Sequence, residues 1–204
     1  VEPFRDMGQQ AWISAHVHAF EYYGGVPRII VPDNAKTAVS KIDSHDPEAN
    51  RTYADMARHY GAAIVPARVR KPKDKAPVET GVQIVERRII AKLRHRQFHG
   101  FDELWEAVRD ELEEVNRKPF QKLPGSRLSV FKETEQPLLR PLPSTRYECA
   151  DWKQVRAGMD YHVQYDGHFY SVPYLYAGKL LELRATANAI EVFCEHERIA
   201  SHIR

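Results

Sequence analysis

The sequence is poor in residues that mark several large protein classes. Its 204 residues include two cysteines, Cys149 and Cys194. Two are too few for a disulfide framework or a cysteine-rich zinc module, and they are typical of a reducing cytoplasm. No run of about 18 or more apolar residues is present, so we expect no membrane span and no membrane partner. The first residues lack the pattern of a secretory signal, and the absence of a P-loop gives no indication of ATP hydrolysis.

Neither sign of charge dominates the whole chain, because 30 Lys and Arg face 28 Asp and Glu, for a net charge of +2. The local distribution is uneven. Residues 66–96 hold ten basic and three acidic side chains, whereas residues 101–114 hold seven acidic and one basic. This pattern favours a basic, polyanion-facing element packed against a solvated acidic helix. Two ordinary solvated faces are the alternative, and both interpretations stay open at this point.

The first half of the sequence alternates between helical and strand patterns. Apolar residues recur at helical spacing over 9–23, and a second helix is expected over 47–59. Short apolar runs at 28–31 and 62–66 are typical of buried strands. The order helix, strand, helix, strand predicts an α/β layer with parallel strands.

The second half changes character twice. A long helix with an apolar stripe is expected from residue 78, and an amphipathic acidic helix over 101–116. Five prolines between 119 and 143 predict an extended linker across a surface. From residue 161 the pattern indicates a hairpin and further alternating strands, which predict a small all-β module of about five strands, a barrel or curled sheet.

Two carboxylates are candidates for metal chemistry. Asp33 directly follows the first expected strand, where α/β folds bind ligands, although an aspartate there also suits a turn or a helix cap. Glu79 opens the long helix, where the helix dipole alone also favours an acid. Glu86 lies two turns further along roughly the same face. Carboxylates on a strand end and a helix suit paired Mg²⁺ ions, which prefer oxygen ligands and can activate a nucleophile in phosphodiester chemistry.

These acids lie in motifs that resemble a known family. VPDN at 31–34 and KPKDKAPVE at 71–79 resemble the second and third acidic motifs of DDE transposases and retroviral-type integrases. The wider sequence is similar to the transposases of IS21-type insertion sequences. The segments that carry this resemblance are QQAW at 9–12, GGVP at 24–27, VER at 85–87, YHV at 161–163, YSVP at 170–173 and RIASH at 198–202.

The resemblance implies a fold, domains and site residues. It implies a partial RNase H-like, integrase-like α/β core over 1–98 and a DNA-binding β-barrel over 161–204. Between them, the residue pattern predicts an acidic amphipathic helix over 99–118 and a proline-rich linker over 119–160. Asp33 and Glu79 would be the second and third catalytic acids and would hold a pair of Mg²⁺ (or Mn²⁺) ions, with Glu86 in a supporting or DNA-facing role. The residues expected to meet DNA phosphates are Arg68, Arg70, Lys71, Lys73 and Lys75.

The family's first catalytic aspartate has no counterpart, because only Asp6 precedes Asp33 and the interval is too short for the missing strands. We therefore expect the C-terminal portion of a transposase, inactive by itself. The parent reaction would be Mg²⁺-dependent cleavage at transposon ends, followed by strand transfer of the freed 3′-OH into target DNA. The implied partners are transposon-end and target DNA, further copies of the protein on that DNA, and an AAA+ helper ATPase, in the bacterial cytoplasm at the nucleoid.

Two other functions remain open. A non-catalytic DNA-binding or assembly module from a truncated transposase gains weight from the missing aspartate, and an RNase H-like hydrolase that only cuts also fits two acids. Among further candidates, His95 and His99 fit a basic helix end better than a metal site, and the cysteines fit core packing. For most of the aromatic residues of the strand-rich tail, barrel core is a better prediction than base stacking. That set is Tyr161, Tyr165, Phe169, Tyr170, Tyr174 and Tyr176.

Overall fold

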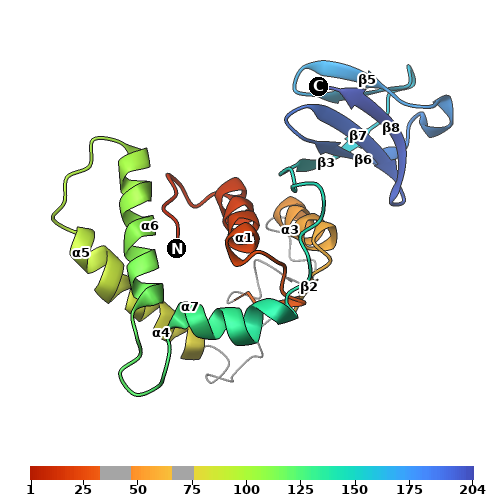
Figure 1. Ribbon diagram of the computed structural model, residues 1–204. Helices are drawn as coiled ribbons and strands as arrows, with labels where there is room; N and C mark the ends of the chain where they lie inside the picture. The colour runs from red at the N-terminus through yellow and green to blue at the C-terminus, as the bar shows by residue number, and fades with distance from the viewer. Residues whose placement is uncertain (33–46, 66–75) are drawn as a thin grey trace.

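The computed structural model describes residues 1–32, 47–65 and 76–204 (Figure 1). Its N-terminal part contains α1 (Gln9–Tyr23), β1 (Ile29–Ile30), α3 (Pro47–His59) and β2 (Ala63–Ile64). The two strands pair in parallel, with Ile29 opposite Ala63. The expected order of helices and parallel strands is therefore confirmed, with shorter strands than the sequence predicted.

A first hydrophobic core joins α1 to α3. Helix α1 buries Ile13, Val17 and Phe20, because these residues lie on one face at helical spacing. They pack in one cluster with side chains of α3 and its surroundings, among them Tyr53, Met56, Tyr60, Val26 and Tyr147. The prediction that these strands are buried is wrong, because Ile29 and Ala63 are exposed and Ile30 and Ile64 are half-buried at the margin of this core.

A helical arm follows. Helix α4 (Ala76–Val85) continues through a π-helical turn, η2 (Glu86–Ile90), into the short α5 (Ala91–Leu93), and α6 (Phe101–Arg117) runs back beside them (Figure 1). The apolar stripe expected along this helix is buried only in part. Ile89 is buried, whereas Val78 and Val82 are 58% and 52% exposed. Packing against α6 therefore covers Ile89 of the π-helical turn and leaves the first turns of α4 open.

The expected proline-rich linker contains a helical segment. Helix α7 (Arg127–Val130) continues into a π-helical turn, η3 (Phe131–Glu135), and a 3-10 turn, η4 (Gln136–Leu138). Its start is fixed by Ser126 and Ser129, whose side chains form a reciprocal capping box. Local capping within a proline-free stretch explains why a helix forms where prolines on either side predict extended chain.

The C-terminal part is a sheet with a hairpin, and the predicted closed barrel is wrong. The strands β3 (Asp151–Arg156), β6 (Leu180–Ala185), β7 (Ala189–Cys194) and β8 (Glu197–Ile203) form one antiparallel sheet in the order β3-β6-β7-β8. The hairpin of β4 (His162–Tyr165) and β5 (His168–Ser171) is a separate two-stranded sheet. Because β3 and β8 stay at the edges, the sheet does not close.

The hairpin and the sheet share a second hydrophobic core. Val163 and Tyr170 of the hairpin pack in one cluster with Leu183, Ile190 and Val192 of the sheet. The first strand, β3, begins ten residues before the strand-rich region expected from the sequence. The domain boundaries given above stay a prediction.

Polar contacts attach this part to α3. Thr52 Oγ1 donates to the backbone oxygen of Ala150 at 3.1 Å, and the Arg51 guanidinium lies 3.8 Å from the Trp152 ring centroid. Arg184 of β6 pairs with Asp55 of α3 at 3.2 Å. The sheet consequently lies beside α3, at the opposite end of the molecule from the helical arm (Figure 1).

Candidate nucleic-acid interface

In the sequence, the predicted acids Asp33 and Glu79 follow the two strands of the small parallel sheet. Of these two acids, the structure describes only Glu79. Because β1 and β2 are parallel, their carboxyl ends share an edge. The chain continues from β1 to Asp33 and from β2 through 66–75 to α4. Asp33 lies outside the described residues, as does the whole set predicted to meet DNA phosphates, which is Arg68, Arg70, Lys71, Lys73 and Lys75.

Glu79 lies in the first turn of α4, as expected, and its side chain is exposed. Glu86, in the π-helical turn, is exposed as well. Within the described ranges no group of three or more His, Cys, Asp or Glu side chains could hold a metal ion. A hard, accessible carboxylate such as Glu79 fits the oxygen chemistry of Mg²⁺ as one ligand of a larger set.

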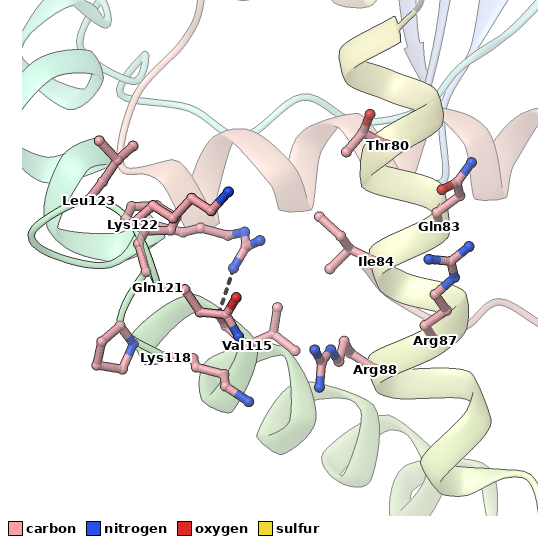
Figure 2. Close-up of a pocket in the computed structure, with 13 residues that line it drawn as sticks. Thr80, Gln83, Ile84, Arg87, Arg88, Val115, Lys118, Gln121, Lys122 and Leu123 are labelled. Atoms are coloured by element: carbon pink, nitrogen blue, oxygen red, sulfur yellow. Dashed lines mark hydrogen bonds between the residues drawn. The ribbon is translucent and has the colours of Figure 1, made fainter.

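A cleft of about 520 Å³ opens between α4 with its π-helical turn and the connection from α6 to α7 (Figure 2). Its lining includes five cationic side chains and no carboxylate. Arg87 and Arg88 come from the helix, and Lys118, Lys122 and Arg127 come from the opposite side. In Figure 2, Ile84 and Arg88 project from the helix towards the side that carries Lys118 and Lys122.

The acidic face of α6 forms its ion pairs with cations outside the cleft. Lys92 Nζ lies 2.7 Å from Glu111 and 2.8 Å from Glu114, and Arg96 lies 3.1 Å from Glu103. The hydrogen bond and charge of Lys92 hold the pKa of Glu114 below its usual value, with smaller contributions from Lys118 and Arg88. The acidic face of α6 is therefore not only solvated, as the sequence predicts. It also pairs with Lys92 and Arg96 of the basic segment 66–96.

The cleft cations themselves have few anionic partners. Among the residues that the structure describes, no carboxylate forms an ion pair with Arg87, Arg88, Lys118 or Lys122. Arg127 is held in place by neutral groups: it donates to the backbone oxygen of Val115 at 3.4 Å, and its guanidinium lies 5.6 Å from the Phe120 ring centroid. The cleft is thus a concave, positively charged surface, the kind that attracts polyanions.

The π-helical turn shapes one wall of the cleft. Glu86–Ile90 forms a single such turn between two α-helical stretches, and Ile89 is its buried anchor. A π turn inserts an extra residue into the helix and is often found at functional sites. Here it carries the adjacent Arg87 and Arg88, both of which line the cleft.

Arg87 and Arg88 belong to the basic block 66–96 but are not singled out by the sequence, and Lys118, Lys122 and Arg127 were not predicted. For Lys118, Lys122 and Arg127, the only sequence signal was that basic residues recur at intervals through the proline-rich stretch. For the aromatic set the outcome is divided. Tyr165 and Tyr170 are buried, whereas Tyr161, Phe169 and Tyr174 are exposed.

In the described part of the chain no helix combines the length and apolar character needed to cross a membrane.

The free thiols of Cys149 and Cys194 are both half-buried. Cys149 packs at the margin of the first core, and Cys194 packs at the margin of the second. Burial raises the pKa of the Cys149 thiol. These surroundings agree with the packing role expected from the sequence.

Residues 142–204, which contain the whole C-terminal sheet, match the model of a family described as Mu transposase, C-terminal domain. The chain is 44% identical over 193 residues to a putative transposase for insertion sequence IS408 from Burkholderia multivorans, covering 95% of this chain and 37% of that protein. It is 26% identical to the transposase for insertion sequence element IS21 from Pseudomonas aeruginosa, covering 91% of this chain and 47% of the relative.

Among solved structures, a simian T-cell lymphotropic virus intasome in complex with PP2A regulatory subunit B56 gamma aligns with a TM-score of 0.49 and 14% identity. This alignment covers 96% of the chain and 62% of the matched one. The chain spans well under half the length of the IS408 relative. By sequence, the chain is related to the transposases of IS21-type insertion sequences and matches a part of their length.

Proposed function

We propose that the chain is part of a DDE-type DNA transposase that cleaves at transposon ends and transfers the freed 3′-OH to target DNA. The observation that carries this proposal is the exposed Glu79 at the start of α4, whose following turns line the cationic cleft. An accessible hard ligand beside a polyanion-attracting surface is what phosphodiester chemistry needs. The transposase names of the relatives support the same reaction.

In this proposal Asp33 and Glu79 hold divalent metal ions, Mg²⁺ or Mn²⁺, through their carboxylate oxygens. When bound, the ions would supply Lewis-acid activation of the attacking and leaving oxygens. The chain's own basic residues orient the DNA, and the loop with Arg68, Arg70, Lys71, Lys73 and Lys75 would contact phosphates irrespective of base sequence.

Other parts of the proposal follow from the family. The DNA partners are transposon ends and target, the protein would assemble in several copies on that DNA, and an AAA+ helper ATPase would take part in target choice. A second candidate is a DNA-binding or assembly module without activity of its own. It is favoured by the cationic cleft, whose Arg and Lys lining suits DNA binding without any chemistry.

Substitution of the two acids tests the proposal. In a full-length transposase that carries this segment, Asp33→Asn or Glu79→Gln should abolish strand transfer, because each removes a charged metal ligand. DNA binding should survive, since neither residue is assigned to the phosphate contacts. Gel separation of joined products, with gel shifts for binding, measures both. Glu86→Gln is the matched control on the same helix and should be milder; near-normal joining by either acid variant would refute the assignment.

A further inference from the structure

We infer that the cleft between α4 and the α6–α7 connection is a second DNA contact, separate from the predicted basic loop, that binds the phosphodiester backbone. The cleft and its cations come from the structure, whereas the choice of DNA as the polyanion depends on the proposed function. The charge, the shape and the position of the cleft all support this inference.

The first step is charge. Arg87, Arg88, Lys118 and Lys122 have exposed side chains and no ion-pair partner among the described carboxylates. The same α6 that supplies Val115 to the cleft uses Glu111 and Glu114 to pair Lys92 outside it. Glu114 interacts with Lys118 and Arg88 without forming an ion pair, so much of the repulsion among these like charges remains, and a polyanion relieves it. A concave, low-dielectric surface also focuses the field on whatever enters.

The second step is shape. Cations line both sides of the cleft, so a negatively charged strand between them can be contacted from two directions (Figure 2). Gln83 and Gln121, also in the lining, offer amide N–H groups suited to phosphate oxygens. The aromatic ring of the lining, Phe120, has the Arg127 guanidinium beside it. Because Arg127 lies over the Phe120 ring, this ring is not open for stacking with a nucleobase. The lining therefore favours contacts with the DNA phosphodiester backbone over base stacking.

The third step is position. Thr80, the neighbour of Glu79, lines the cleft, and Arg87 follows eight residues after Glu79. At a helical rise of 1.5 Å per residue this interval spans roughly 12 Å. A strand held by Arg87 and Arg88 therefore lies along the helix that carries the proposed metal ligand, a few nucleotides from it. The cleft cations are positioning residues for the DNA and do not touch the reacting phosphate.

The test is DNA binding by the chain itself, measured by fluorescence anisotropy with a labelled duplex at several salt concentrations and without divalent metal. The double variant Arg88→Gln/Lys122→Gln removes one cation from each side of the cleft. Each phosphate contact contributes about 0.9 to the slope of log affinity against log salt, so we expect the slope to flatten by up to about 1.8.

The control double variant is Arg94→Gln/Arg109→Gln, which removes the same charge from exposed residues outside the cleft lining. It should leave the slope unchanged. Circular dichroism and the thermal midpoint confirm that both variants fold. An unchanged slope for the cleft variant, or equal flattening in both variants, would overturn the inference. Displacement of the DNA by poly-glutamate at equal charge concentration would also overturn it, because an acidic peptide would then fit as well.

This result is independent of the metal site. A flattened slope together with normal joining by Asp33→Asn would refute the transposase mechanism and leave the cleft as a DNA site. The reverse outcome, an unchanged slope with joining abolished by Asp33→Asn, would refute the cleft and leave the mechanism.

Discussion

At the scale of single residues, Arg184 connects the C-terminal sheet to α3. Its guanidinium donates to Glu191 at 2.8 Å and to Asp55 at 3.2 Å, and its side chain is only 18% exposed. Desolvation alone would raise the pKa of Glu191, but hydrogen bonds from Arg198 and Arg184 outweigh it and lower that pKa. Arg184 thus pairs with two half-buried carboxylates, of which Glu191 also has Arg198, whereas Asp55 has no second ion pair among the described residues.

We expect Arg184→Ala to lower the free energy of unfolding by about 3 kcal/mol, because it leaves the largely buried Asp55 without its ion-pair partner. Urea unfolding followed by circular dichroism measures the change. Arg198→Ala is the matched control: Arg198 also pairs with Glu191, at 2.7 Å, but from an exposed position, and its loss should cost less than about 1 kcal/mol. Equal losses for the two variants would contradict a structural role specific to Arg184.

At the scale of elements, a short bridge joins the end of α1 to the chain that follows α7. The backbone N–H of Val26 donates to Arg140 O at 2.9 Å, and the reciprocal bond has the same length. Gly25 permits this approach, because a Cβ there would lie 2.7 Å from Leu139 Cβ and 2.8 Å from Arg140 O. The bridge holds the α7 segment against the first core.

Gly25→Ala should therefore destabilise the protein by about 1–3 kcal/mol through overpacking against backbone that cannot yield cheaply. Gly81→Ala is the comparison within α4, where an added Cβ meets nothing within 4 Å. It should stabilise by about 0.5–1 kcal/mol, as alanine does in a helix interior. Thermal unfolding of both variants measures the two effects, and a tolerated Gly25→Ala would show that the bridge is not close-packed.

The elements also show how far the sequence predicts the fold. The bounds of α1 and α3 agree with prediction because periodicity and stop signals are local to each helix. The barrel prediction fails because strand pairing is non-local, so nothing within β3 or β8 indicates that each remains an edge. The cleft was missed for the same reason, since its cations come from two segments about 30 residues apart that tertiary packing brings together.

At the scale of the whole molecule, the cationic cleft and the exposed aromatic residues of the C-terminal part lie far apart. The cationic cleft lies on the helical arm, and the exposed Tyr161, Phe169 and Tyr174 belong to the C-terminal part, with the α1–α3 core between them (Figure 1). The prediction that the C-terminal part binds DNA is therefore separate from the inference about the cleft.

Product analysis of a strand-transfer reaction tests the central claim most directly. A full-length transposase carrying this segment is incubated with Mg²⁺, a labelled transposon end with a free 3′-OH and a target plasmid. We predict covalently joined end–target products that are lost in Glu79→Gln. Nicked DNA without joining would instead identify a hydrolase, and a gel shift with neither product would identify a binding module; either result would contradict the account.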